Sequence, residues 1–351
     1  MQIRFTFRYQ RKVNIMVTNS IDTIEISNFK SIKNLKVENC KRINLFVGTP
    51  NAGKSNLLEA VSTLMVLNEK SKFNFNELVR LKNATELFNY GNIKSPVTIN
   101  IGGNTSLSIT YNTDTTLNFK YFQTNTSDIQ TQVAIQGAAG TTLNQAVFLC
   151  THIFKYQFEK GCQFNSKENA SDLTAFNGNN LFWVVENNNE LKEFFFDIIK
   201  EFGLKFYNQQ PQNSLIVFKE LSQFNIFSFS FELLPDTVQR LLFYHTAIAT
   251  NTGNILLFEE PEAHMFPPYI SKFTNDVVES LSNQFFIATH SPYVINDFLD
   301  RSIDDLAIHE LYFEEGETKC YTLSKDNLDT IYQMGAESIF LNLERFRENA
   351  G

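Results

Sequence analysis

Apolar runs too short to be typical helices recur along the chain and predict buried strands. They span residues 43–47, 254–258 and 284–289 and carry mainly branched or aromatic side chains without alternation. Helical spacing of apolar residues follows the first two runs, over residues 55–67 and 267–281. Apolar strands that alternate with helices indicate a parallel sheet covered by helices.

A second kind of strand alternates apolar with polar residues and predicts an antiparallel sheet with one buried face. Residues 22–29 alternate in this way, and residues 35–38 form the expected partner strand. Three further alternating segments, separated by Gly- and Asn-rich turns, predict a β-meander over 97–101, 107–111 and 117–122. The small and polar residues 130–142 predict a surface loop.

The middle of the chain mixes helices and strands. We expect a helix over residues 74–88, and a strand around 146–154. A further helix spans 191–202 and is ended by Gly203. Strands follow at 215–219 and 223–232.

The last third of the chain returns to helices and strands of the sheet. A helix is expected over residues 236–250, and Asp236 and Gln239 form a capping-box pattern at its start. A hairpin-like pair flanks the turn 314–317, and a final helix follows it. We find no heptad run long enough for a coiled-coil arm and no internal repeat.

These elements predict an α/β protein with a mixed central sheet flanked by helices, an antiparallel β-meander and a small α+β insertion. The boundaries we expect are a flexible N-terminal extension (1–20), an N-terminal lobe with the β-meander (21–130), an α+β insertion (131–233) and a C-terminal lobe (234–351). Within the extension, Met16 is as natural a start as Met1.

Composition narrows the class of protein. The net charge is −8 and the isoelectric point is about 5.3, so no global basic field attracts nucleic acid, although a local basic patch remains open. The four cysteines are scattered without a C-x-x-C pair, which predicts reduced thiols in the cytoplasm and neither a zinc site nor a disulfide framework. No apolar run approaches the roughly 20 residues of a membrane helix.

The strongest motif lies between the strand at 43–47 and the helix behind it. It reads G-x-x-x-x-G-K-S, the pattern of a phosphate-binding loop in its strand–loop–helix context. The glycines allow a tight turn whose N–H groups point at phosphates, and the helix start adds partial positive charge. The predicted ATP-binding residues are Gly48, Thr49, Pro50, Asn51, Ala52, Gly53, Lys54, Ser55 and Asn56. Lys54 is expected to reach the β- and γ-phosphates, and Ser55 to hold Mg²⁺.

Two other predicted strands also end in polar clusters, and ligands bind at the carboxyl ends of parallel strands. Glu259 ends one strand and is placed to help hold Mg²⁺. Glu260 is the expected general base for the attacking water, and His290, after the next strand, is expected to stabilise charge on the γ-phosphate. Taken alone, residues 259–262 could equally be a solvated acidic turn before a helix, but the phosphate loop favours the catalytic interpretation.

The order of the segments GTPNAGKSN, LPDTVQR, LLFEEPEAH and FFIATHSP resembles ABC-type ATPases of the SMC/RecF/OLD group, and is most similar to their compact AAA-like branch associated with bacterial anti-phage defence. The opening segment 24–31 fits the same branch, so the likeness spans about residues 21–346. The resemblance implies a P-loop head that pairs head-to-tail over two ATP·Mg²⁺. It also implies control of a separately encoded nuclease or toxin, or action on DNA.

The chain departs from the pattern of that group in several places. A Ser-x-Gly signature normally faces the partner's nucleotide, and here the helix start offers Asp236, Thr237 and Arg240 instead. Glu259 replaces the usual Asp. A glutamine loop is expected, but neither Gln123 nor Gln130 has a convincing context. Two alternatives therefore stay open: a nucleotide-gated scaffold with negligible hydrolysis, and a DNA-binding or repair ATPase of RecF-like type.

Overall fold

The computed structural model describes residues 20–67, 75–124, 128–134, 141–142, 152–164, 166, 170–209 and 214–348. The predicted N-terminal extension lies outside these residues except for Ser20. Most of the strand expected at 146–154 also lies outside them.

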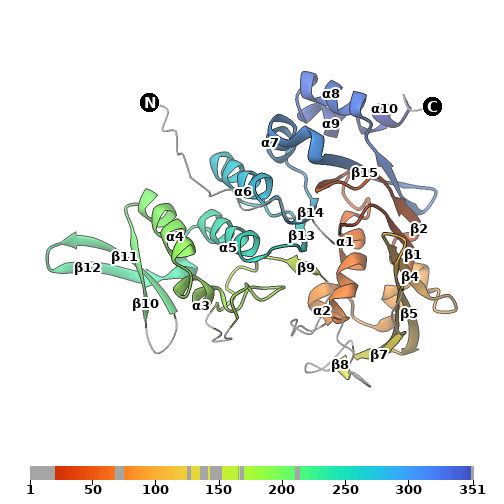
Figure 1. Cartoon of the computed structure of the whole chain (residues 1–351), viewed down its shortest axis with the longest axis horizontal. Coiled ribbons are helices and arrows are strands. Elements are labelled where there is room, and N and C mark those ends of the chain that lie inside the picture. Colours follow the sequence, from red (N-terminus) through yellow and green to blue (C-terminus); the bar gives the residue numbers. More distant parts are fainter. Residues whose placement is uncertain are drawn as a thin grey trace.

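A six-stranded sheet runs through the molecule in the order β16-β15-β3-β14-β13-β9 (Figure 1). Neighbouring strands are parallel, apart from the antiparallel β15–β16 hairpin at one edge. The strands are β3 (Ile43–Val47), β9 (Ile153–Tyr156), β13 (Ile255–Glu259), β14 (Gln284–Ala288), β15 (Leu306–Glu314) and β16 (Glu317–Thr322). Every residue of β3 and β14 is buried, which explains the lack of alternation in their sequences. The predicted parallel sheet and the hairpin around 314–317 are confirmed.

A seven-stranded antiparallel sheet has the order β2-β1-β4-β5-β6-β7-β8. Its strands are β1 (Ile24–Phe29), β2 (Ile32–Val37), β4 (Val97–Ile101), β5 (Thr105–Thr113), β6 (Thr116–Gln123), β7 (Ile129–Ala134) and β8 (Thr141–Thr142). Ile24 lies opposite Val37 on one side and Ile101 on the other, so the predicted hairpin and β-meander share one sheet. The loop expected over 130–142 is wrong in part, because β7 pairs with β6 and extends the meander.

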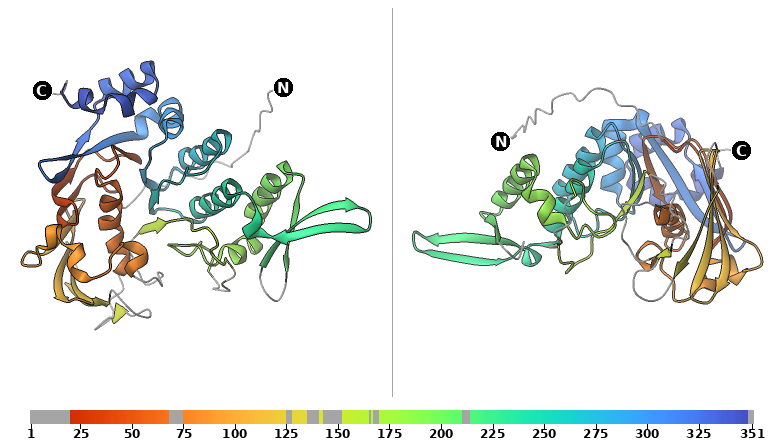
Figure 2. Two further views of the ribbon diagram at one scale, coloured as in Figure 1. Left: turned by 180° about the vertical axis from the view of Figure 1, so that it is seen from behind. Right: turned by 60° about the horizontal axis from the view of Figure 1, so that its bottom comes forward.

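Helix α1 (Lys54–Ser62) contacts both sheets, meeting β1 on one side and β13 and β14 on the other. This explains why residues on every face of its C-terminal half are buried. A 3-10 turn, Thr63–Leu67, completes the helix expected over 55–67. Helices α6 (Pro267–Glu279) and α7 (Pro292–Ser302) pack on each other and lie away from the antiparallel sheet (Figures 1 and 2).

The helix expected over residues 74–88 is wrong: only Phe75–Leu78 is α-helical (α2), and a 3-10 turn follows at Ala84–Leu87. Contacts with distant segments hold the chain between them. The Arg80 carbonyl accepts a hydrogen bond from Lys30 Nζ at 3.0 Å, and Ala84 N–H donates to the Asp114 carbonyl at 3.1 Å. These interactions replace intrahelical bonds, so tertiary contacts override helical propensity.

Helix α5 (Asp236–Thr250) has the predicted bounds, but the predicted capping box is wrong. Pro235 is the cap residue, and no side chain hydrogen-bonds to the first backbone N–H groups. The Gln239 amide instead donates to the carbonyls of Glu232 and Leu234, at 3.1 and 2.7 Å. Gln239 therefore holds the segment that precedes α5 in place.

A lobe projects from the body beside α5 and contains a three-stranded antiparallel sheet in the order β10-β11-β12 (Figures 1 and 2). Its elements are α3 (Leu181–Glu186), α4 (Asn189–Glu201), β10 (Lys205–Gln209), β11 (Ser214–Ser222) and β12 (Asn225–Ser230). Gly203, at φ +68°, lies just beyond α4 as predicted. Phenylalanine rings fill the base of this lobe, where Phe231 lies 5.3 Å from Phe182 and 6.4 Å from Phe195 between ring centroids.

The C-terminal segment forms three short helices rather than the one predicted: α8 (Lys325–Met334), α9 (Glu337–Leu341) and α10 (Leu343–Glu348). Gly335, at φ +87°, breaks the helix after α8. Within the described residues the longest helix is α5, with 15 residues, and no helix is long and apolar enough to cross a membrane.

Candidate nucleotide site

The phosphate loop connects the carboxyl end of β3 to the start of α1, as predicted. Gly48 has φ +147° and Gly53, the N-cap of α1, has φ +100°. A Cβ atom on Gly48 would lie 2.1 Å from the Leu311 carbonyl oxygen of β15, so only glycine fits there. Thr49, Pro50 and Asn51 form the exposed crest of the loop, and Ala52 and Gly53 are buried beneath it.

Lys54 is buried, and its ammonium group donates to the Gly48 and Thr49 carbonyls at 2.9 and 3.0 Å. Burial lowers the pKa of Lys54, although the Glu260 carboxylate acts in the opposite direction. The Asn56 amide donates to the Ser31 hydroxyl at 2.7 Å, and so ties the start of α1 to the antiparallel sheet. Of the predicted loop residues, Lys54 thus faces the loop interior and Asn56 faces away toward Ser31.

Glu259, the last residue of β13, lies near Ser55, whose hydroxyl helps to lower the pKa of the Glu259 carboxyl group. Two cations flank the carboxylate: Lys155 Nζ is 3.4 Å from one oxygen and Arg80 Nη2 is 3.5 Å from the other. Burial alone would raise the pKa of Glu259, but Lys155, the Ser55 hydroxyl and Arg80 together lower it. Glu259 is therefore held as an anion beside Ser55.

The cations belong to a charged network that sequence reasoning missed. Lys155 is 2% exposed in the middle of β9, and Glu59 is 1% exposed on α1. Lys30 and Arg80 both hydrogen-bond to Glu59, so Arg80 bridges Glu59 and Glu259. Burial lowers the pKa of Lys30, although Glu59 opposes this shift. A charged residue inside an otherwise apolar strand or helix face was the only sequence signal of the network.

Glu260 and His290 leave adjacent strands and meet at the same edge. Glu260 has φ +45°, and its backbone N–H donates to the Ala288 carbonyl at 2.9 Å. One carboxylate oxygen is 3.5 Å from His290 Nε2, and both side chains are about half exposed. Burial and Lys54 lower the pKa of His290, and Glu260 opposes them, which favours a neutral imidazole. The structure therefore brings Lys54, Glu260 and His290 together.

Glu262 fixes the two loops that carry Glu260 and His290. Its carboxylate accepts hydrogen bonds from the Thr289 hydroxyl and, at 3.3 Å, from the His290 backbone N–H. The side chain is buried, and burial raises the pKa of its carboxyl group. Sequence reasoning placed Glu262 in the acidic cluster but gave it no role, and its partners identify a positioning residue.

The residues expected to contact a second copy's nucleotide are engaged within one chain. Asp236 and Arg240 form an ion pair at 2.9 Å, and Arg240 stacks on the Phe158 ring at 4.9 Å. The Thr237 hydroxyl donates to the His264 carbonyl at 2.6 Å. A role for these residues across an interface stays a prediction.

Gln157 is a glutamine that sequence reasoning did not consider. It directly follows β9, whose last residue, Tyr156, pairs with Phe258 in the parallel β9–β13 ladder. Gln157 thus leaves the sheet at the same edge as Glu259. The signal that could have found it is a short apolar strand ending in Gln, but Lys155 interrupts the apolar run.

The donor groups at this edge fit a magnesium ion. Mg²⁺ prefers oxygen ligands and usually binds to one or two protein groups together with the phosphates of its nucleotide. Ser55 and Glu259 supply such oxygens and lie near each other. Across the described ranges, no three or more His, Cys, Asp or Glu residues gather in a way that would hold a metal ion.

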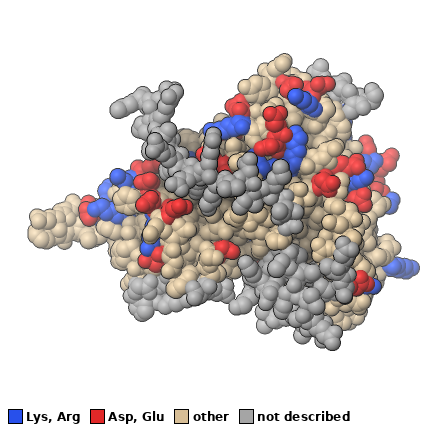
Figure 3. All heavy atoms as spheres, in the orientation of Figure 1, with Lys and Arg blue, Asp and Glu red and all other residues tan. Residues whose placement is uncertain are grey.

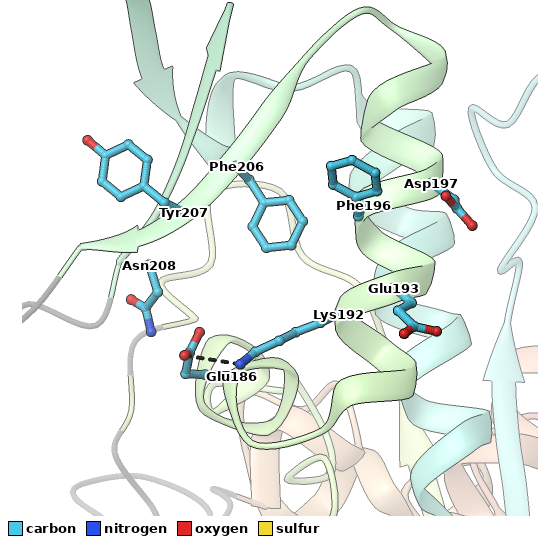
Figure 4. A pocket seen from close by; sticks show the side chains of 8 residues that line it. All are labelled: Glu186, Lys192, Glu193, Phe196, Asp197, Phe206, Tyr207 and Asn208. Atoms are coloured by element: carbon cyan, nitrogen blue, oxygen red, sulfur yellow. Dashed lines mark hydrogen bonds and ion pairs between the residues drawn. The ribbon is translucent and has the colours of Figure 1, made fainter.

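A hollow lies far from this edge, between α4 and β10 (Figure 4). It has a volume of about 520 Å³, and Phe196 and Phe206 point toward each other across it. Its charged residues are Glu186, Glu193, Asp197 and Lys192, and Lys192 is paired with Glu186 at 3.2 Å. The remaining carboxylates would repel phosphate groups, so this hollow is a poor nucleotide site.

The sheet order and the phosphate loop give this chain the fold of an ABC-type P-loop head. A family model described as "AAA domain, putative AbiEii toxin, Type IV TA system" matches residues 164–296, less than half of the chain. The match includes Glu259, Glu260 and His290, but it begins after the phosphate loop and does not include it.

One solved structure and two curated proteins are among those similar to this chain. The crystal structure of an Smc head bound to the C-winged helix domain of ScpA matches with a TM-score of 0.52 at 14% identity, over 89% of this chain and 100% of that one. An uncharacterized protein of Methanocaldococcus jannaschii is 45% identical over 49 residues, 14% of this chain and 22% of that protein. An ATP/GTP phosphatase of Helicobacter pylori is 47% identical over 45 residues, 13% of this chain and 12% of that protein. Both sequence matches thus span less than a quarter of the relatives they match.

Proposed function

We propose that this protein binds ATP with Mg²⁺ and hydrolyses it to ADP and phosphate. The observation that carries the proposal is the convergence of three strand ends. The carboxyl ends of β3, β13 and β14 lead to Lys54, Glu259–Glu260 and His290 at one edge of the sheet. General acid–base residues and phosphate-binding groups must meet in this way for phosphoryl transfer to water.

Each residue has a distinct task in the proposed reaction. The backbone N–H groups of the loop and the Lys54 ammonium group bind the β- and γ-phosphates. Ser55 and Glu259 would hold the Mg²⁺ ion, which supplies charge neutralisation at the phosphates. Glu260 orients the attacking water and accepts its proton, and neutral His290 hydrogen-bonds to the γ-phosphate or the water. We assign Gln157 to the glutamine loop that the resemblance implies.

Two copies are proposed to pair head-to-tail over two nucleotides and to separate after hydrolysis. Asp236, Thr237 and Arg240, at the start of α5, are proposed to face the nucleotide of the second copy. The resulting movement would control a separately encoded effector, such as a nuclease or toxin, in phage defence. The AbiEii-type description of the matching family supports an effector, and the Smc head crystallised with ScpA is an example of such a head with a protein partner.

One observation favours a second candidate, a nucleotide-gated scaffold with negligible hydrolysis. Glu259 replaces the usual Asp and is held between Lys155 and Arg80, which compete with a metal ion for its oxygens. Such a protein would bind ATP and change its assembly state without releasing phosphate.

Phosphate release and ATP binding, measured on the same protein, distinguish the candidates. The wild type should bind ATP·Mg²⁺ and release phosphate, and Lys54→Ala should lose both. Lys192→Ala, far from the nucleotide site, is the matched control and should keep wild-type activity. Binding without phosphate release would favour the scaffold, and failure of the wild type to bind ATP would contradict both candidates.

A further inference from the structure

The β11–β12 hairpin projects from the body and exposes large apolar side chains at its far end (Figure 1). Phe224 is 92% exposed, and Leu221, Ile226 and Phe227 are each between 58% and 60% exposed. In Figure 3 the tip of this protrusion shows no charged group on the visible face, and charged side chains begin behind the tip. Four such side chains lie within seven residues, and exposed apolar side chains gathered in this way often mark interaction sites.

Strand β12 is also an open edge. Among the described residues it pairs only with β11, so its outer backbone groups are free to pair with another strand. Natural edge strands are usually protected by lysine, proline, a bulge or short length. Residues 221–230 contain no charged residue and no proline, and the one irregularity in register lies on the β11 side, between Glu220 and Ser222. The strand therefore lacks the usual protection against pairing.

We propose that β12 pairs with β12 of a second copy of this chain, in antiparallel orientation, to form a continuous six-stranded sheet. A two-fold axis normal to the sheet keeps equivalent faces of the two copies on the same side. With Ser228 at the axis, Phe227 of each copy lies opposite Phe229 of the other. In one copy these two rings already share a face, with centroids 5.8 Å apart. Cross-strand aromatic pairs of this kind stabilise a sheet.

Charge favours a second copy of β12 over the other edge of the same sheet. Because β12 has no charged side chain, pairing it with itself brings no like charges together. The opposite edge, β10, begins with Lys205 and lies beside the carboxylates of α4. Pairing through β10 would place those charges near their symmetry copies. In an isologous contact through β12, both copies use the same surface, and the free edge of each copy is paired.

This interface is separate from the proposed head pairing. The hairpin joins the body through the projecting lobe, whereas the nucleotide site lies at the edge of the central sheet. A chain with two different isologous surfaces can assemble beyond a dimer. ATP would then join β12-linked dimers into larger assemblies. The small contact area is expected to give a micromolar dissociation constant.

The test measures molar mass by light scattering after size-exclusion chromatography, without nucleotide and in the Lys54→Ala background. Any dimer seen there cannot come from ATP-driven pairing, so the result is independent of the proposed ATPase function. We expect a dimer at about 100 µM. Phe227→Asp should raise the dissociation constant of this dimer by at least about 10-fold, so that the variant is a monomer. Tyr332→Asp, at a similarly exposed aromatic residue on α8, is the matched control and should remain dimeric.

A monomeric parent protein at that concentration would overturn the proposal, as would a Phe227→Asp variant that remains dimeric. A second measurement tests the geometry through oxidative cross-linking of Ser228→Cys, against the parent with its native cysteines. Ser228→Cys should form a disulfide-linked dimer, and Phe227→Asp should abolish it. Ser222→Cys, near the hairpin tip and away from the axis, should not cross-link above the parent level. Equal cross-linking at both positions would contradict the proposed register.

Discussion

At the scale of single residues, the chemistry of the site depends on how Glu259 is held. Its carboxylate lies between Lys155 and Arg80, and Arg80 also binds Glu59. Charges removed from water are costly unless they are paired, so each member of the network stabilises its neighbours. Lys155 matters most for Glu259, because it is the strongest of the charges that lower the pKa of this group.

Replacing Lys155 with Met should destabilise the protein while nearly preserving side-chain volume. Glu259 would keep only Arg80 as a cation, and we expect the free energy of unfolding near neutral pH to fall by about 1–3 kcal/mol. The pKa of Glu259 is lowered in the folded protein, so its favourable contribution exists above the ordinary value of 4.5 and is lost as the pH falls below it. The difference between wild type and variant should therefore shrink in acid. Urea denaturation at several pH values measures it.

Lys192→Met is the matched control, because it removes a lysine from a surface ion pair with Glu186. Its effect should stay within about 0.5 kcal/mol. In a Glu259→Gln background the cost of Lys155→Met should largely disappear, since the buried carboxylate is gone. An undiminished cost in that background would show that Lys155 acts by packing alone.

Site residues that directly follow strands could be predicted from the sequence. Residues whose side chains form ion pairs between distant elements could not. The positions of Lys54, Glu259, Glu260 and His290 follow from motif order and from the shared edge of parallel strands. Arg80 and Lys155 come from a loop and a strand that have no motif of their own, and their shared partner Glu259 lies over a hundred residues away in sequence. Such contacts depend on tertiary packing, which local patterns do not encode.

At the scale of elements, β15 limits the conformation of the phosphate loop. The Leu311 carbonyl lies against Gly48, so the loop and this strand must fit each other closely. The sequence identified the need for glycine from the loop motif, but the contact with β15 could not be foreseen. The failed helix at 74–88 has the same origin, because hydrogen bonds from Lys30 and to Asp114 come from distant elements.

Gly48→Ala should destabilise the protein by more than the cost of placing alanine at a positive φ angle. The added methyl group would overlap a backbone oxygen at 2.1 Å, and we expect a loss of about 3 kcal/mol in stability together with loss of ATP binding. Gly253→Ala is the control, since Gly253 also has positive φ (+73°) but has open space around it. It should cost only about 1 kcal/mol. Thermal and urea unfolding measure the stability of both variants. An equal loss of stability in Gly48→Ala and Gly253→Ala would contradict a steric role for β15.

A buried acid on β15 should give the protein a measurable pH dependence. Burial raises the pKa of Glu310 to about 7, against the opposing effect of Arg347 on α10. The folded protein thus holds this proton more tightly than the unfolded chain, and the free energy of unfolding falls as the pH rises from 4.5 to about 7. Glu310→Gln should match the wild type at about pH 5 and be more stable by about 1–3 kcal/mol at about pH 8.5.

Urea unfolding at the two pH values tests this expectation. Glu314→Gln, at the exposed end of the same strand, is the control and should show no such gain at the higher pH. A Glu310→Gln protein that is less stable than wild type at both pH values would show that the pair with Arg347 outweighs the cost of burial.

At the scale of the whole molecule, one side carries the candidate nucleotide site and another carries the projecting hairpin. The sequence predicted the two sheets and the strands β11 and β12 of the projecting lobe, because hydrophobic periodicity fixes which face of a strand is buried, but it did not predict β10 (Lys205–Gln209). The exposure of the hairpin could not be predicted, because an apolar strand has the same hydrophobic pattern whether or not a partner covers it. The proposed head pairing and the proposed hairpin pairing can therefore be tested separately.

The central claim is that Glu260 is the base of an ATP-driven pairing cycle, and Glu260→Gln tests it most directly. Molar mass and phosphate release should be measured in ATP·Mg²⁺, at a concentration where the nucleotide-free protein has a known mass. We expect the variant to bind ATP, to lose phosphate release by at least about 100-fold, and to accumulate a larger ATP-dependent assembly that the turning-over wild type forms only transiently. Wild-type phosphate release by Glu260→Gln, with no change in mass, would contradict the account.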